Sequence, residues 1–189
     1  ATMCGNGSRA AALYAFKHGL CGRELAFQTG AGRICAQVLE NEHIAVQFPF
    51  VRILQDNLQE CAMPAFLLDT GVPHLVLCAH DDVELVRPTS EELRALRVRY
   101  DANVDVMCVA QNTVHVRTFE RGVEAETLAC GTGMAACFVV AHHNGQLGDE
   151  GIVIPASDEK LHFYFAHDFL WFSGKVQHVA TCKTDMLSF

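Results

Sequence analysis

Two short segments of this chain repeat each other, and each opens an alanine-rich apolar run. The first is Cys4-Gly5-Asn6-Gly7 and the second is Cys130-Gly131-Thr132-Gly133. Glycines around a small polar residue leave backbone N–H groups free at a helix start, where the helix dipole favours negative charge. The repeat therefore predicts two helices, each beginning at a cysteine, whose thiols face one substrate from opposite sides.

The position of the two cysteines suits acid/base chemistry on carbon. A thiolate is the reactive form, and a helix N-terminus lowers the pKa of a cysteine. One cysteine could remove a proton while the other returns a proton to the opposite face, which inverts a stereocentre without a metal or cofactor. The free N–H groups could hold a substrate carboxylate and stabilise the carbanion. Taken singly, each segment is more typical of a tight turn into a helix, but the repetition favours the catalytic interpretation.

Length and charge limit the possible classes of protein. The chain has 189 residues, of which half are hydrophobic, so it can form one large or two small domains with a sizeable core. Its net charge is −8 and no two Lys or Arg residues are adjacent, which argues against a nucleic-acid partner. We find no apolar run of membrane-spanning length and no signal-peptide pattern, and we expect a cytoplasmic protein.

The nine cysteines are scattered and odd in number. They include no Cys-x-x-Cys pair and no spacing typical of metal ligands, so no metal site is predicted. Apart from Cys4 and Cys130, we expect them to be reduced, buried and inert, as in a reducing compartment.

The remaining pattern is mostly short strands, with one apolar helix in each half of the chain. It predicts an α/β fold of the α+β type, with two pseudo-symmetric halves that each wrap a mixed or antiparallel sheet around a central helix. Residues 1–56, joined by a last strand over 175–189, are assigned to the N-terminal half, and 57–174 to the C-terminal half. The predicted helices cover 7–18, 90–99 and 130–144. The predicted strands cover 24–28, 33–39, 43–48, 65–68, 74–78, 103–109, 113–119, 152–154, 161–165 and 175–182.

A charged loop precedes the second cysteine. Glu120 and Arg121 follow a predicted strand and could hold the ammonium and carboxylate groups of an amino acid. A solvated surface loop is an equal alternative on this pattern alone.

Several segments occur together in an order that resembles the diaminopimelate epimerase family. They are residues 3–7, Gly71-Val72-Pro73-His74, Asn103-Val104, Glu120-Arg121-Gly122 and 129–133. The resemblance covers nearly the whole chain. It implies a homodimer with its active site in the cleft between the halves, no pyridoxal phosphate or other cofactor, and interconversion of L,L- and meso-diaminopimelate for lysine and peptidoglycan-precursor synthesis.

The resemblance also implies roles for individual residues. Cys4 and Cys130 correspond to the acid/base pair, and His74 and Glu120 to catalytic residues that tune the thiols and orient the substrate ammonium. Asn103 and Arg121 correspond to residues that recognise the distal end of the substrate. The full set of implied substrate-binding residues is Gly5, Asn6, Asn103, Glu120, Arg121, Gly131 and Thr132.

The chain departs from the family pattern at two places that bear on activity. Val72 stands where many members have an asparagine that contacts substrate. Family members also carry several dozen residues before the first motif, so residues 1–56 would be only the remainder of the N-terminal half, and the first helix would expose an apolar face. On this basis we expect the 189-residue chain alone to be poorly folded or inactive.

Three alternatives stay open. A proline or hydroxyproline epimerase shares the two-thiol chemistry, but typically has histidine after the first Cys-Gly and lacks the Glu-Arg-Gly loop. An isomerase of the phenazine type shares the fold without the cysteines. A truncated, non-catalytic member of the diaminopimelate epimerase family would bind a ligand or partner through its second half.

Overall fold

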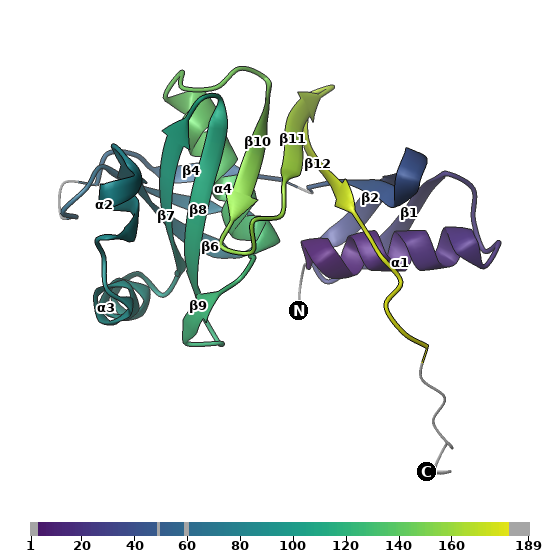
Figure 1. Cartoon of the computed structure of the whole chain (residues 1–189), viewed down its shortest axis with the longest axis horizontal. Helices are drawn as coiled ribbons and strands as arrows, with labels where there is room; N and C mark the ends of the chain where they lie inside the picture. The colour runs from purple at the N-terminus through teal and green to yellow at the C-terminus, as the bar shows by residue number, and fades with distance from the viewer. Residues whose placement is uncertain (1–3, 49, 59–60, 182–189) are drawn as a thin grey trace, which may run out of the picture.

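The computed structural model describes residues 4–48, 50–58 and 61–181 (Figure 1). The described residues form twelve strands and a small number of helices. Their order along the chain is α1 (Gly5–Lys17), β1 (Glu24–Thr29), β2 (Gly32–Val38), a 3-10 turn η1 (Glu40–Glu42), β3 (His43–Gln47), β4 (Arg52–Gln55), β5 (Ala65–Asp69), β6 (Pro73–Ala79), α2 (Asp82–Val86), α3 (Ser90–Tyr100), β7 (Asn103–Ala110), β8 (Thr113–Glu120), β9 (Ala125–Thr127), α4 (Gly131–His143), β10 (Glu150–Pro155), β11 (Leu161–Ala166) and β12 (Phe169–Lys175).

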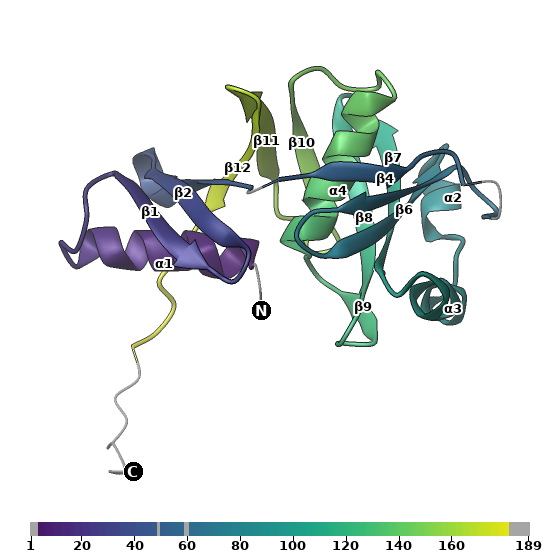
Figure 2. The same ribbon diagram turned by 180° about the vertical axis from the view of Figure 1, so that it is seen from behind.

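The strands form one continuous, strongly curved sheet that serves both halves of the molecule. Among the described residues the strand order is β1-β2-β3-β12-β11-β10-β8-β7-β6-β5-β4, with β9 added beside β8. Most neighbours are antiparallel, and the pairs β6–β7 and β8–β10 are parallel. Figures 1 and 2 show α1 lying along the small group of strands at one end and α4 enclosed by the larger group at the other. The predicted mixed fold with one central helix in each half is confirmed.

The strands of the larger half are covered on both faces. One face of β6, β7 and β8 packs against α4, and the other packs against α2 and α3 through Leu85 and Leu93. Burial on both faces explains why β7 reads as a nearly continuous apolar run rather than an alternating one. Asp105, in the middle of β7, is the exception: it is a charged residue that is fully buried in this apolar strand.

Both central helices begin where the repeated segment predicts. Cys4 and Cys130 are the N-cap residues, in extended conformation, and their carbonyl groups accept the first helical bonds from Ser8 and Met134. The helix over 90–99 is also confirmed as α3, with a capping box between Thr89 and Glu92.

The prediction for the last strand was wrong. It began at Lys175 and ran to 182, or to 189 where the N-terminal half was assigned, but β12 ends at Lys175 and the described residues 176–181 form no strand. Residues 182–189 lie outside the described residues. The turn before β12 is built by His167 and Asp168, both with positive φ, and a hairpin turn of this kind is usually marked by Asn-Gly. Without that marker the strand over 169–175 escaped prediction, as did β4 and α2.

Within the described residues, no helix is both long and apolar enough to cross a membrane.

Candidate active site

A cavity of about 270 Å³ lies where α1 and α4 begin, between the two halves. It gathers every residue that the sequence assigned to the site except His74. The lining residues are Cys4, Gly5, Asn6, Val72, Asn103, Glu120, Arg121, Ala129, Cys130, Gly131 and Thr132.

The two helix starts touch each other at glycines. A Cβ atom added to Gly131 would lie 3.5 Å from the Cα atom of Gly5, and one added to Gly5 would lie 2.8 Å from the ring of Phe172. Gly5 therefore has no room for a side chain unless the ring of Phe172 moves. The glycines therefore let two helices from distant parts of the sequence bring their N-termini, and the cysteines that cap them, to one cavity.

Cys4 is the more accessible of the two cysteines. Its side chain is exposed, and its Sγ atom accepts a hydrogen bond from the N–H of Gly7 at 3.3 Å. Behind it, Arg9 is only 3% exposed and donates from Nη2 to Oδ1 of Asn6 at 2.6 Å. Arg9 was not assigned from the sequence, although an arginine in the first turn after the glycines was the signal that could have identified it.

Cys130 is held more tightly. It lines the cavity and keeps some exposure, but protein atoms surround it on most sides. Burial raises the pKa of Cys130 to about 12, and the negative charge of Asp105 adds to the rise, while the hydroxyl group of Thr132 and the amide of Gly133 act against it. Burial thus moves this pKa in the direction opposite to the lowering expected at a helix start.

His74 lies behind the cavity wall rather than in it. Its side chain is fully buried, with Nδ1 2.6 Å from Oδ2 of Asp105 and Nε2 3.0 Å from Oγ1 of Thr132. The same hydroxyl group is 3.4 Å from Sγ of Cys130. The hydroxyl group of Thr132 therefore lies between His74 and the Cys130 thiol in the cavity.

The charged residues Glu120, at the end of β8, and Arg121, just after it, both have protein partners. Glu120 accepts a hydrogen bond from the hydroxyl group of Thr127 at 2.5 Å. The guanidinium of Arg121 donates to the backbone carbonyl and the carboxylate of Asp101 at 2.8 and 3.0 Å, and the Arg121 N–H donates to Oδ1 of Asn103 at 2.9 Å. Arg121 is thus tied to Asp101 as well as lining the cavity.

The other cysteines differ in part from the prediction. All eight described cysteines are free thiols, but only Cys108 and Cys137 are buried, and Cys21, Cys35, Cys61 and Cys78 are half-buried. Over residues 4–48, 50–58 and 61–181, no group of three or more His, Cys, Asp or Glu side chains could hold a metal ion.

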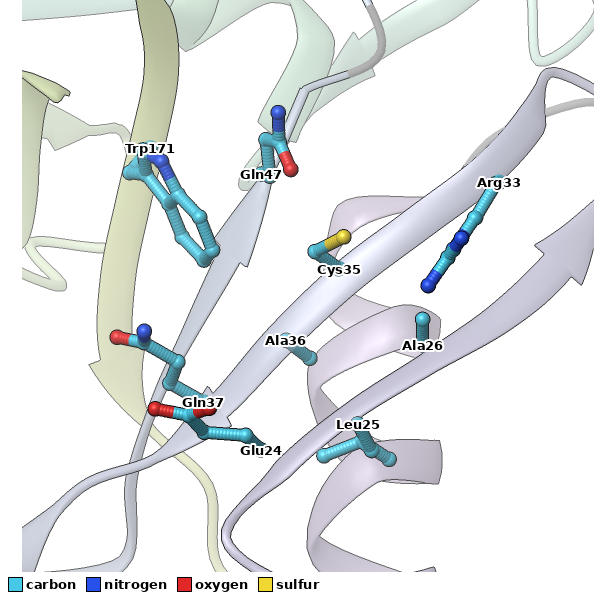
Figure 3. Close-up of a pocket in the computed structure, with 9 residues that line it drawn as sticks. All are labelled: Glu24, Leu25, Ala26, Arg33, Cys35, Ala36, Gln37, Gln47 and Trp171. Atoms are coloured by element: carbon cyan, nitrogen blue, oxygen red, sulfur yellow. The ribbon is translucent and has the colours of Figure 1, made fainter. Parts of the chain in front are cut away.

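A separate hollow of about 400 Å³ lies over β1, β2, β3 and β12 (Figure 3). Its lining includes Trp171, Gln47, Cys35 and Arg33, and it contains neither repeated segment. Although it is larger than the cavity at the helix starts, its lining has a single cysteine, Cys35, and so cannot supply a pair of thiols.

The fold belongs to a recognisable two-lobed class. It is similar to a phenazine biosynthesis PhzC/PhzF protein from Clostridium difficile, with a TM-score of 0.69 and 17% identity over 97% of this chain and 74% of the other. It is also similar to a hydroxyproline epimerase from Agrobacterium vitis, with a TM-score of 0.66 and 14% identity over 92% of this chain and 64% of the other. At these identities the likeness establishes the fold alone.

Sequence similarity identifies the family. The family model for diaminopimelate epimerase matches residues 66–178. Diaminopimelate epimerases from Nitratiruptor sp., Campylobacter jejuni and Helicobacter pylori are 43%, 40% and 33% identical to this chain, which covers 70%, 70% and 74% of their lengths, with 95%, 94% and 100% of this chain aligned. The chain therefore belongs to the diaminopimelate epimerase family and is an epimerase.

Proposed function

We propose that this enzyme interconverts L,L- and meso-diaminopimelate, with Cys4 and Cys130 as the acid/base pair. The observation that supports this most directly is that the two N-capping cysteines line one cavity at touching helix starts. The names of the sequence relatives supply the substrate, which the geometry alone does not specify.

The proposed reaction needs no cofactor. One sulfur atom takes the α-proton as a thiolate, and the other gives a proton as a thiol from the opposite face, so the α-carbon inverts. The backbone N–H groups at both helix starts would bind the α-carboxylate and stabilise negative charge in the transition state. Gly5, Asn6, Gly131 and Thr132 line the cavity at these two helix starts, which supports assigning them to that clamp.

The distal amino-acid end of the substrate is assigned to the other side of the cavity. In this proposal Glu120 binds an ammonium group, and Arg121 exchanges part of its pairing with Asp101 for the distal carboxylate beside Asn103. Val72 lines the cavity with an apolar side chain and can offer only its backbone as a hydrogen-bond partner.

A proton-exchange assay tests the proposal. The protein is incubated with L,L-diaminopimelate in D₂O under reducing conditions and followed by NMR, with trans-4-hydroxy-L-proline as a comparison substrate. Deuterium at the α-carbon together with the meso isomer is the expected result. Exchange of hydroxyproline alone would support the alternative epimerase, and no exchange from folded protein would identify a non-catalytic member.

Two matched variants test the roles of the thiols. Cys4→Ser and Cys130→Ser each replace one acid/base group, and each should reduce epimerisation by about 10²–10⁴-fold, the usual contribution of such a group. Cys35→Ser, in the separate hollow, is the control and should keep the rate. If either catalytic variant also keeps the rate, the two-thiol assignment fails.

The family also suggests an oligomeric state, a compartment and a pathway for this protein. We infer a homodimer in the cytoplasm, acting in lysine and peptidoglycan-precursor synthesis, and a division of the chain into 1–56, joined by 175–189, and 57–174. Light scattering of the purified protein would test the dimer, and limited proteolysis at the boundary would test the division.

A further inference from the structure

The carboxylate of Asp105 has no role in the two-thiol reaction as proposed above, yet it is buried and both of its oxygen atoms have partners. It is fully buried on β7, and its two oxygen atoms have separate partners. Oδ1 accepts from the hydroxyl group of Thr118 at 2.6 Å, and Oδ2 lies 2.6 Å from Nδ1 of His74. A buried carboxylate is costly unless it is paired, and among the described residues His74 is its only ion-pair partner.

Strand pairing brings these groups together. The parallel pair β6–β7 sets His74 opposite Asn103 and Val76 opposite Asp105. Side chains two residues apart on a strand share a face, so His74, Asn103 and Asp105 lie on the same side of the sheet. That side faces the start of α4, where a Cβ atom on Gly133 would lie 2.2 Å from Oδ1 of Asp105.

The surrounding hydrogen bonds fix which nitrogen of His74 carries the proton. The amide oxygen of Asn103 accepts from the N–H of Arg121, so its Nδ2 atom is the donor that reaches the carbonyl of Pro73 at 3.2 Å and Nε2 of His74 at 3.3 Å. A donor amide beside Nε2 requires that nitrogen to be an acceptor. Nδ1 therefore carries the proton and donates it to Asp105.

We propose that Asp105 is a positioning residue: it keeps Nδ1 of His74 protonated, so that Nε2 can receive the proton of the Cys130 thiol through the hydroxyl group of Thr132. The S–H bond of Cys130 breaks as its proton moves to Oγ1 of Thr132, and the O–H proton of Thr132 moves to Nε2. The products are a thiolate and an imidazolium, with the hydroxyl group restored. The reverse transfer returns the thiol, so Cys130 can act as base or acid without net change.

The carboxylate of Asp105 supplies the negative charge that stabilises a buried imidazolium at His74. A positive imidazole in a buried site is unfavourable alone, and a carboxylate 2.6 Å away offsets its charge. The other titratable groups around Cys130 have no hydrogen bond to His74 among the described residues: the carboxylate of Glu120 accepts from Thr127 instead, and Cys4 and Cys137 are thiols. Arg121 lines the same cavity but is paired with Asp101. This inference rests on the proposed function only for the use of the Cys130 thiolate.

The effect of Asp105→Asn on the reactivity of Cys130 distinguishes this proposal from a direct effect of the Asp105 charge on the thiol. A negative charge near a thiol opposes its ionisation, so removing the charge would speed the reaction of Cys130 with iodoacetamide if Asp105 acted on the thiol alone. In our proposal Asp105→Asn slows the alkylation of Cys130 at least tenfold at neutral pH, because His74 loses the charge that supports its protonation. The rate is read on the Cys130 peptide by mass spectrometry and needs no epimerase activity.

A matched control makes the same chemical change at an exposed histidine–carboxylate pair. Asp149 lies 3.2 Å from Nε2 of His142, and Asp149→Asn should leave Cys130 alkylation and epimerisation unchanged. An unchanged or faster Cys130 rate in folded Asp105→Asn overturns the proposal, whether or not the protein epimerises diaminopimelate. If the unaltered protein does not epimerise diaminopimelate but Asp105→Asn still slows the alkylation of Cys130, the proposed function fails and this inference stands.

A measurement on the unaltered protein decides the matter if Asp105→Asn does not fold. His74 is the only fully buried histidine among the described residues, so ¹⁵N NMR can identify it by its slowly exchanging ring proton. The proposal requires that proton on Nδ1 and a bare Nε2. A proton on Nε2 with a bare Nδ1 overturns it.

Discussion

The two halves of the molecule carry the same helix start in different surroundings. The helix α4 is enclosed by strands, with nine of its residues buried, whereas α1 buries five and leaves Tyr14 61% exposed. Cys4 is exposed, while Cys130 sits among protein atoms with a hydroxyl, an imidazole and a carboxylate in line behind it. The repeated segment therefore specifies the backbone at each helix start, and the residues packed around it specify the proton affinity of the thiol.

The largest expected difference between the halves is in helix burial. Phe138 on α4 is fully buried and packs near Phe163, so Phe138→Ala should lower the free energy of unfolding by about 3–5 kcal/mol. Tyr14→Ala on α1 removes an exposed ring and should cost less than about 1 kcal/mol. Urea unfolding of both variants measures the two values. Equal losses would mean that α1 is covered in solution.

The two thiols should also differ in reactivity. The pKa of Cys130 is raised to about 12, so its thiol stays protonated at neutral pH and its alkylation rate should still climb as the pH passes 9. Cys4 is exposed, and Cys130 should react on the order of 100-fold more slowly at pH 8, because the thiolate is the nucleophile and burial raises the pKa of Cys130. Peptide mapping after timed alkylation gives both rates. A faster Cys130 would reverse the comparison.

The last glycine of each repeated segment, Gly7 or Gly133, should tolerate a methyl group to a different degree. Gly133→Ala would drive a methyl group to 2.2 Å from the Asp105 carboxylate and should destabilise the protein by about 1–3 kcal/mol. Gly7→Ala meets only the side chain of Cys4, at 3.4 Å, and should be nearly neutral. Thermal unfolding of this matched pair provides the measurement. A tolerated Gly133→Ala would show that the carboxylate can move.

The smallest effect is expected at Glu159, the carboxylate that pairs with Arg9. Glu159 lies 3.6 Å from Arg9 but is 39% exposed, so water screens the pair, and Glu159→Gln should change stability by less than about 1 kcal/mol. The equivalent change at fully buried Asp105 should cost more, since its partners lose a buried acceptor. Chemical unfolding of both variants ranks them. A larger loss at Glu159 would contradict the screening argument.

The sequence predicted the helix starts because their signals are local. Cys4 and Cys130 precede glycines and alanine-rich runs, and Thr89 and Glu92 form a capping box within four residues. The strand β12 escaped because its turn uses His167 and Asp168 in place of the usual residues.

The part of the site that the sequence did not reveal depends on pairing between distant segments. The pairing of His74 with Asp105 arises from the register of β6 and β7, which no local pattern specifies. The one signal available was a lone carboxylate in an apolar strand. The raised pKa of Cys130 is a property of its enclosure, and the helix start suggested the opposite direction.

The pairing of β3 with β12 has a consequence for the order of folding. The N-terminal half is synthesised first, but it is fixed beside the other half through a strand that ends at Lys175. Contacts between such distant residues require closure of a long loop and form late. On a ribosome, Cys4 would remain away from Cys130 until β12 had emerged, so the cavity would be completed only after both of its cysteines had long been synthesised.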